Sequence, residues 1–598
     1  MIKGEIIRKN FIEFFKNKSH QIVKSASLIP ADPTALFTSA GMQQFVPYLS
    51  GEAEPPYSRA CSVQKCFRTS DIDEVGDEFH HTFFEMLGNW SFGDYFKKEA
   101  IAWSLEFLIN ECQLEKDRLW VTIFKGFESN LGEKIPYDSE AEDIWQNNGI
   151  AKEKIKSFGI EDNFWGPVGA FGPCGPCSEI HYDLGKEFQK KTCLLENCGP
   201  NCGCGRFVEI WNLVFMEYNK DKDGHFKKLI NKNIDTGAGL ERLICILQNK
   251  KSDYQTDLFL PIMEKIKEIS LKNNLEDSKE SRIIADHIRG ACFLIADGVM
   301  PSKEDRGYVL RRIIRRAMRY GRSMEMEKDF LIILAKVVIN LYQNIYPDLA
   351  KKQNEILTII RDEQEKFNQT LNQGLKKIKK VIQESLLEKK DYLEPEIVFH
   401  LYDTYGFPLE LTKEIAIENN LKIDDESFQK RFKKHQNISR AGVKSKFGGV
   451  GEWGEQVAPH HSATHLLHQA LRLVLGDHVQ QAGSDLTQER IRFDFTHQQK
   501  MTESDIKRVE QIVNEKIKEN LEIKMEEMSY LEAINSGALA FFKEKYPEKV
   551  RVYSIGEFSK EICAGPHAKN TKELGEFKII KEKASGAGVR RIKAILIK

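Results

Sequence analysis

The order of apolar and polar residues divides the chain into three stretches. Residues 1–248 mix helical spacing with apolar runs rich in β-branched and aromatic residues, such as RLWVTIF from Arg118 and RFVEIWNLVFMEYN from Arg206. Gly, Pro and Asn separate these runs, a pattern typical of strands joined by turns. We therefore expect residues 1–248 to form an α+β domain built on a largely antiparallel sheet.

Residues 249–452 have a helical pattern, because apolar residues recur at spacings of three and four and proline is scarce. The charged stretch Asn354–Lys390 predicts one long exposed helix or a helix pair. The Gly-rich segment 446–459 predicts a linker. Residues 453–598 open with a helix over 460–475 and then alternate strands with helices, so a third, α+β domain is expected.

The composition fits a soluble multidomain protein. The chain has 598 residues, 41% hydrophobic and 30% charged, which exceeds the size of one core. The N-terminus lacks a signal-peptide core, and the apolar run FLIILAKVVIN is short and contains Lys336, so we expect no membrane span. The cysteines, twelve in all, occur largely in clusters or singly in apolar runs, which favours metal or catalytic roles in a reducing cytoplasm.

Two strand-like segments carry candidate chemistry. Arg68 follows the run SVQKCF, and a guanidinium held there suits a carboxylate or a phosphate in bidentate geometry. A plain surface arginine is the alternative. Phe83 and Phe84 could stack an adenine base, although core packing is the ordinary use of phenylalanine.

A third segment, DTGAGLER, begins at Asp235 and ends at Arg242. Its Gly237 and Gly239 suit a place where the backbone approaches a ligand closely. Asp235 offers a carboxylate to a small cationic substrate. Together the three segments supply what a site for a nucleotide and such a substrate needs.

The segment 306–322 holds seven arginines in seventeen residues. Its apolar residues recur four apart and predict one buried stripe, so the arginines should lie on the opposite stripe. Because this stripe contains no acid, we expect a phosphate-binding surface. The residues chosen for it are Arg311, Arg315 and Arg319.

Two groups of residues have the composition of zinc sites. His461 and His465 lie four apart on one helix face, and CAGPH adds Cys563 and His567. Four further cysteines lie in a Gly/Pro-rich stretch, where a structural zinc and a compact loop of reduced thiols remain open alternatives. They are Cys193, Cys198, Cys202 and Cys204.

The segments around Arg68, Phe83 and Asp235 resemble motifs 2 and 3 of class II aminoacyl-tRNA synthetases, and in detail the alanyl-tRNA synthetase family. The resemblance implies ATP and Mg²⁺ as requirements and L-alanine and tRNA(Ala) as substrates. By it, Arg68 contacts the α-phosphate and the alanine carboxylate, Arg242 is the motif 3 arginine, and Asp235 pairs with the substrate ammonium. The resemblance also assigns a pocket for one methyl group to Met42, Trp165 and Val214, with Asn212 beside it.

The same resemblance makes the arginine-rich segment part of a tRNA acceptor-stem domain. It implies that Asp403 reads the third acceptor pair, a G:U wobble. The family usually has an asparagine nearby, where this chain has Lys303 in PSKEDRGYV. Lysine can donate to a base or bind phosphate but cannot accept from the guanine amino group.

Residues 453–598 resemble the family's editing domain, with one zinc at His461, His465, Cys563 and His567 and with Gln481 in the editing pocket. The usual CGGTH reads CAGPH here, which removes a hydroxyl and predicts weak editing of Ser- or Gly-tRNA(Ala). The family's β-barrel and C-terminal domain are expected to be absent, so we expect a monomer.

Two other functions remain as alternatives to an alanine–tRNA ligase. One is a deacylase that only hydrolyses mischarged tRNA, and the other is a synthetase-like RNA-binding protein without catalysis. The presence of Arg68, Asp235 and Arg242 together argues against both.

Overall fold

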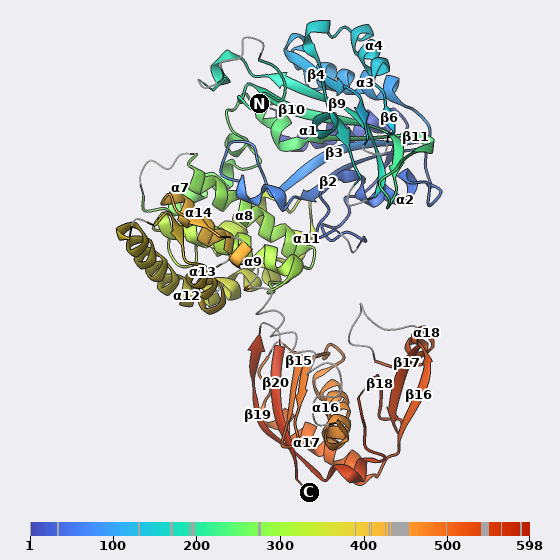
Figure 1. Ribbon diagram of the computed structural model, residues 1–598, viewed down its shortest axis with the longest axis vertical. Helices are drawn as coiled ribbons and strands as arrows, with labels where there is room; N and C mark the ends of the chain where they lie inside the picture. The colour runs from blue at the N-terminus through green and yellow to red at the C-terminus, as the bar shows by residue number, and fades with distance from the viewer. Residues whose placement is uncertain are drawn as a thin grey trace. The chain divides into compact units, whose positions relative to one another are not determined.

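The structure is a computed structural model. It describes residues 2–597, except for 33–34, 130–131, 168–170, 191–192, 194–197, 273–276, 389, 406, 408, 425, 429–430, 432–453, 498, 540–548, 564 and 587–588. The chain forms two compact units, one of residues 1–379 with 405–411 and one of residues 380–404 with 412–598 (Figure 1). The boundary between the units falls inside a helix, so the three-domain division stays a prediction.

The first unit contains a nine-stranded sheet (Figure 1). Across the sheet the strands are β1 (Gln21–Ile22), β2 (Arg59–Phe67), β3 (Phe83–Phe92), β11 (Phe226–Gly239), β10 (Phe207–Lys220), β9 (Gly172–Asp183), β4 (Leu119–Phe124) and β7 (Ile155–Phe158), with β8 (Phe164–Trp165) paired to β9. Among the described strands the neighbours are antiparallel except β1–β2 and β4–β7. The expected antiparallel α+β architecture is confirmed.

Aromatic packing holds the first helix on this sheet. Helix α1 (Gly4–Asn17) places Phe11 and Phe15 with ring centres 5.9 and 6.4 Å from Trp211 of β10. Each of these three side chains is fully buried. Burying large aromatic rings is among the strongest apolar contributions to a core. Further helices of this region are α2 (Val46–Leu49), α3 (Lys97–Glu106), α4 (Ser139–Asn147), α5 (Ile160–Asn163) and α6 (Leu240–Leu247).

The helical stretch follows the sheet. Its helices are α7 (Leu260–Ile269), α8 (Lys279–Ala296), α9 (Asp305–Ser323), α10 (Phe330–Tyr342), α11 (Asp348–Lys351) and α12 (Gln353–Leu387). Helix α8 joins this layer to the sheet, since Phe293 stacks on Phe83 of β3 with ring centres 4.0 Å apart. The long helix expected over 354–390 is a single helix, α12.

The second unit contains α13 (Pro395–Tyr405), most of α14 (Leu409–Glu418) and the short parallel pair β12 (Tyr392–Leu393) and β13 (Lys422–Ile423). Most of the expected linker, 446–453, lies outside the described residues. The helix expected over 460–475 is α16 (Ala458–Leu475), which has a proline in its first turn. Proline suits this position because the first helical N–H groups have no partner inside the helix.

Two sheets follow α16. The four-stranded sheet consists of β14 (Gln481–Leu486), β15 (Ile491–Thr496), β20 (Val589–Ile597) and β19 (Glu576–Gly586), and the three-stranded sheet of β16 (Ile523–Ser529), β17 (Lys549–Ile555) and β18 (Ser559–Ile562). Apolar residues of α16, of α17 (Glu503–Lys518) and of the four-stranded sheet share one buried core, which includes Leu467, Val513 and Phe493. The short helix α18 (Tyr530–Asn535) accompanies the other sheet.

None of the described helices has both the length and the apolarity needed to cross a membrane.

Candidate functional site

Asp235 lies at the centre of the large sheet, between two residues on neighbouring strands. Its register partners are Trp90 on β3 and Val214 on β10. The Trp90 indole Nε1–H donates to Asp235 Oδ1 over 2.6 Å. Burial raises the pKa of Asp235 from 3.8 to about 7, although the Trp90 hydrogen bond opposes the rise. A buried carboxylate of this kind gains most from a cationic partner.

An apolar cluster surrounds this carboxylate. Met42, Val214 and Trp90 are buried in one cluster, and the half-buried Trp165 packs against it. The structure thus brings together the three residues expected to form the methyl pocket. Asn212 lies two residues before Val214 on β10, and its Nδ2 donates weakly to Glu179 Oε1 over 3.4 Å. Sequence reasoning missed Trp90, which the period-two alternation from Phe84 places on the same strand face.

A cleft of about 570 Å³ adjoins the cluster and contains Arg68. Its lining residues are Ala35, Leu36, Phe37, Ser39, Ala40, Phe67, Arg68, Thr69, Ser70, Asp71 and Trp165. Arg68 Nε donates to the Ser39 carbonyl over 3.2 Å, and the guanidinium lies 4.9 Å from the ring centre of Phe84. Arg68 is therefore held at the cleft by one hydrogen bond and one aromatic ring.

The prediction that both phenylalanines could stack a base is wrong for Phe83. Its ring is fully buried and stacks on Phe293. Successive side chains of a strand point to opposite faces, so Phe84 lies half-buried on the face of Arg68 while Phe83 faces helix α8. Phe84 alone keeps the geometry of a base platform.

The third segment ends β11 and begins α6. A Cβ added to Gly237 would come within 2.7 Å of Met86 Sδ, so a larger residue there would have to displace the Met86 side chain. Gly239 precedes the first residue of α6. Arg242 Nη1 donates to the carbonyl and the carboxylate of Glu209, each over 3.4 Å, long contacts that leave the guanidinium about a third exposed.

The prediction that the arginines of helix α9 face solvent is wrong for part of the helix. Arg315 is buried and pairs with the buried Glu363 of α12, with 2.6 Å from Nε to Oε1. Arg311 donates to the same carboxylate over 3.4 Å, and the half-buried Arg319 lies 4.7 Å from the ring centre of Tyr320. The spacing within α9 identified the apolar face but could not indicate that an acid 48 residues later covers the other face.

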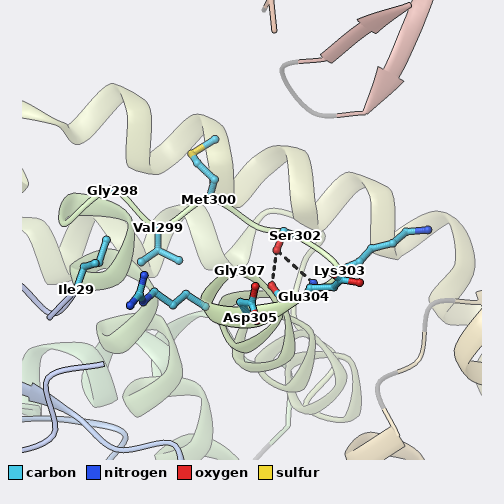
Figure 2. A pocket seen from close by; sticks show the side chains of 10 residues that line it. Ile29, Gly298, Val299, Met300, Ser302, Lys303, Glu304, Asp305 and Gly307 are labelled. Carbon is cyan, nitrogen blue, oxygen red and sulfur yellow. Dashed lines mark hydrogen bonds between the residues drawn. The ribbon is translucent and has the colours of Figure 1, made fainter. Parts of the chain in front are cut away.

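A second cleft, of about 540 Å³, lies at the start of α9 (Figure 2). Lys303 is exposed and its side chain extends away from the Ser302–Glu304 turn, which is closed by a 2.6 Å hydrogen bond from Ser302 Oγ to the Glu304 carbonyl. The backbone of Asp403 belongs to α13, but its side chain lies outside the described residues.

Four predicted metal ligands converge between α16 and the turn after β18. Ligand atoms of His461, His465, Cys563 and His567 all lie within 4.8 Å of one another. Cys563 Sγ lies 3.2 Å from His461 Nε2. Burial opposes ionisation of Cys563, but hydrogen bonds to the surrounding histidines hold the pKa of this thiol well below its usual range.

The ring nitrogens of His567 support a metal-ligand role. Its Nδ1 lies 3.2 Å from Ser462 Oγ, whereas its buried Nε2 has no hydrogen-bond partner among the described residues. Glu561 contacts His465 Nδ1 at 3.0 Å and so fixes the orientation of that ring. A metal ligand whose other nitrogen is held by an oxygen is the usual arrangement in zinc sites, so these residues fit Zn²⁺. Gln481 is half-buried, and its Nε2 donates to Ser484 Oγ over 3.1 Å.

The second cysteine group also converges. The sulfur atoms of Cys193, Cys198, Cys202 and Cys204 lie within 4.8 Å of one another, with separations of 2.9 Å for Cys202–Cys204 and 3.7 Å for Cys193–Cys198. Sulfur atoms that each lie about 2.3 Å from one tetrahedral zinc ion are separated from one another by similar distances. Burial and neighbouring thiols raise the pKa of Cys198, so a bound cation would have to stabilise its thiolate.

Comparison with protein families agrees with this geometry. A family model described as "tRNA synthetases class II (A)" matches residues 6–479, and one described as "Threonyl and Alanyl tRNA synthetase second additional domain" matches residues 550–593. The second match includes Cys563 and His567.

Similar proteins match over the whole chain. The alanine–tRNA ligase of Borrelia hermsii is 49% identical over 605 residues and covers 100% of both chains. That of Treponema denticola is 48% identical, covering 99% of this chain and 98% of its own, and that of Dehalococcoides mccartyi strain 195 is 39% identical, covering 100% and 80%. Among solved structures, S. aureus histidyl-tRNA synthetase has 13% identity and a TM-score of 0.27 over 41% of this chain and 65% of its own, too low to support an argument. The chain belongs to the alanyl-tRNA synthetase family of class II synthetases.

Proposed function

We propose that this chain attaches L-alanine to tRNA(Ala) in two steps. A carboxylate oxygen of alanine attacks the α-phosphorus of ATP, and the bond from the α-phosphorus to the oxygen that bridges it to the β-phosphorus breaks. Pyrophosphate departs, and alanyl-adenylate is formed. A hydroxyl of the terminal tRNA ribose then attacks the alanyl carbonyl carbon, its proton is released, and AMP leaves. Positioning and charge stabilisation account for most of the catalysis in such a reaction.

One observation carries this proposal: a buried carboxylate, Asp235, lies against an apolar cluster that includes Val214 and Met42. Asp235 would pair with the alanine ammonium, and the cluster would enclose one methyl group. Arg68 would bind the alanine carboxylate and the α-phosphate from the adjoining cleft. Phe84 would stack the adenine, and Arg242 would bind the outer phosphates. Mg²⁺, when bound with ATP, offsets the charge of the leaving pyrophosphate.

Alanine-dependent pyrophosphate exchange tests the site assignment. Replacing Arg68 by Ala removes the charge that would stabilise the reacting phosphate, and loss of such a donor typically lowers kcat by about 10²–10³-fold. Arg68→Lys keeps the charge but not the two-pronged geometry, so an intermediate rate is expected. Exchange at the parental rate in Arg68→Ala would show that Arg68 takes no part in the reaction.

For tRNA selection we propose that Asp403 and Lys303 take part in reading the third acceptor pair, and Lys303 lies at the 540 Å³ cleft. The exposure of Lys303 supports a donor role toward a base or phosphate. Arg311 and Arg319 would add phosphate contacts, whereas the buried pairing of Arg315 with Glu363 favours a structural role for that residue. Asp403→Ala is expected to relax discrimination at the third pair while leaving tRNA-independent exchange unchanged.

We also propose that residues 454–598 hold one zinc ion at His461, His465, Cys563 and His567 and hydrolyse Ser-tRNA(Ala) there. The Cys563–His461 contact supports this ligand set, as does Nε2 of His567, which has no hydrogen-bond partner among the described residues. Zinc, when bound, polarises a water or the ester carbonyl. Pro566 replaces the family's hydroxyl beside the ligands, so hydrolysis is expected to be slow.

A second zinc ion at Cys193, Cys198, Cys202 and Cys204 is proposed as structural, because four thiols leave no open coordination position. All twelve cysteines are free thiols in the structure, which supports a reducing, cytoplasmic location. We propose a monomer, which sedimentation at micromolar concentration would test.

A further inference from the structure

Helix α9 donates hydrogen bonds to both sides of the cleft that contains Arg68. We call residues 35–40 the first wall loop and residues 68–75 the second wall loop, since residues of the first and residues 68–71 of the second line the cleft. The two loops meet where Arg68 Nε donates to the Ser39 carbonyl. Their relative placement therefore determines where the Arg68 guanidinium points.

Arg306, in the first turn of α9, holds the first wall loop. Its Nη2 donates to the Ala35 carbonyl over 3.1 Å, and its Nε donates to the Leu36 carbonyl. A planar guanidinium can bind two successive carbonyls at once, which a side chain with one donor cannot. Arg306 also lines the 540 Å³ cleft beside Lys303, so one residue lines that cleft and holds a wall of the other.

Arg316 holds the second wall loop from about three turns further along α9. Its buried guanidinium donates through Nη1 to the Ile72 carbonyl over 2.8 Å and through Nη2 to the Val75 carbonyl over 3.4 Å. Arg312 adds an ion pair with Asp73 at the tip of the same loop. Backbone carbonyls buried in this way need donors, and α9 supplies them.

A buried hydrogen-bond network extends from Arg316 to the backbone of Arg68. Arg316 Nη1 donates to His287 Nε2 over 3.0 Å, so the ring proton lies on Nδ1, which donates to Asp286 Oδ2 over 2.9 Å. Asp286 accepts from the Thr82 amide over 2.9 Å, and the Thr82 carbonyl accepts from the Arg68 amide over 2.8 Å. Helix α9 therefore reaches Arg68 through its loop and through the adjoining strand.

We propose that Arg306 and Arg316 are positioning residues for alanine activation, which hold the two wall loops so that the Arg68 guanidinium faces the reacting phosphate. This inference rests on the proposed function. Arg306 and Arg316 come from the segment 306–322, which is expected from its sequence to bind RNA. The inference gives them a role in alanine activation, a step that needs no RNA. A displacement of about 1 Å at a reacting group can cost about 10²-fold in rate.

The test is pyrophosphate exchange without tRNA in Arg306→Gln, normalised to active sites titrated by adenylate formation. We expect kcat to fall about 10- to 100-fold, because the shorter Gln side chain lacks the planar fork of donors that reaches both carbonyls. The KM for alanine should rise less than kcat falls, since a displaced Arg68 weakens the carboxylate contact while Asp235 and Val214, paired in the sheet, keep the ammonium and methyl contacts. Arg306→Lys should recover part of the loss. Arg316→Lys should behave like Arg306→Gln.

Arg322→Gln is the matched control, because Arg322 is exposed at the end of the same helix. Its exchange should equal that of the parent. Normal exchange in Arg306→Gln with impaired charging of tRNA would overturn the proposal and make Arg306 an RNA contact. A lower total exchange rate with a parental kcat per titrated site would also overturn it. That result would show only that fewer molecules are folded. Failure of the proposed function would appear separately, as a parent without alanine-dependent exchange.

Discussion

Replacing Trp90 by Phe tests how the buried carboxylate of Asp235 works. The substitution keeps an aromatic ring against Phe45, whose ring centre lies 4.6 Å from that of Trp90, but removes the 2.6 Å hydrogen bond to Asp235 Oδ1. A hydrogen bond to a charged group contributes about 1.5–3 kcal/mol, so kcat/KM for alanine should fall by about 10- to 150-fold at pH 8. The effect should appear mainly in KM if Asp235 binds the ammonium equally in the ground and transition states.

The pH dependence of kcat/KM for alanine in the parent and in Trp90→Phe is an independent test of the role of Asp235. Asp235 must be ionised to pair with the alanine ammonium, and its pKa is about 7. In the parent, kcat/KM for alanine should therefore fall about tenfold per pH unit below pH 7 and level off above it. Because the Trp90 hydrogen bond lowers the pKa of Asp235, the break in the profile should move to higher pH in Trp90→Phe.

Trp145→Phe is the control for this pair of measurements. Trp145 is also fully buried, and its Nε1 donates to the neutral Ser178 Oγ over 2.8 Å. Its loss should affect stability without moving the pH break. An unchanged alanine KM together with an unmoved break in Trp90→Phe would refute the role given to Asp235.

Three further predictions concern stability and metal content. Asp235→Asn should abolish exchange yet raise the unfolding temperature at pH 8. Because folding raises the pKa of Asp235 from 3.8 to about 7, the ionised carboxyl destabilises the fold above pH 7. The difference in unfolding temperature between variant and parent should vanish below about pH 4. Arg315→Gln should lower the free energy of unfolding by up to about 3–5 kcal/mol, because the buried Glu363 would keep only the longer, 3.4 Å contact from Arg311, and equal urea midpoints for variant and parent would contradict this. Mass spectrometry of metals should find two zinc ions in the parent and one each in Cys563→Ala and Cys202→Ala; two zinc ions retained in either variant would remove that ligand set.

Much of the fold followed from local patterns. The runs around Trp120 and Trp211 became strands β4 and β10, and the charged stretch from Asn354 became helix α12, because period-two and helical spacing depend on nearby residues alone. Two of the candidate zinc ligands, His461 and His465, could be paired from sequence for a related reason. Histidines four apart lie on one helix face wherever the helix packs.

What could not be predicted depends on contacts between distant segments. Trp90 lies 145 residues from Asp235, and only the register of β3 against β11 makes it a hydrogen-bond donor to that carboxylate. Arg315 and Glu363 are 48 residues apart and meet because α12 packs along α9. Phe83 and Phe84 look alike in sequence, but strand alternation sends one into the core.

The most direct test of the central claim is pyrophosphate exchange by the parent with alanine, glycine and serine as separate substrates. A pocket for one methyl group predicts exchange with alanine, and glycine reduced by about 10- to 200-fold, the usual cost of one missing carbon. Serine should be accepted measurably, which is why an editing site would be needed. Exchange that requires another amino acid, or none with alanine, would contradict the account.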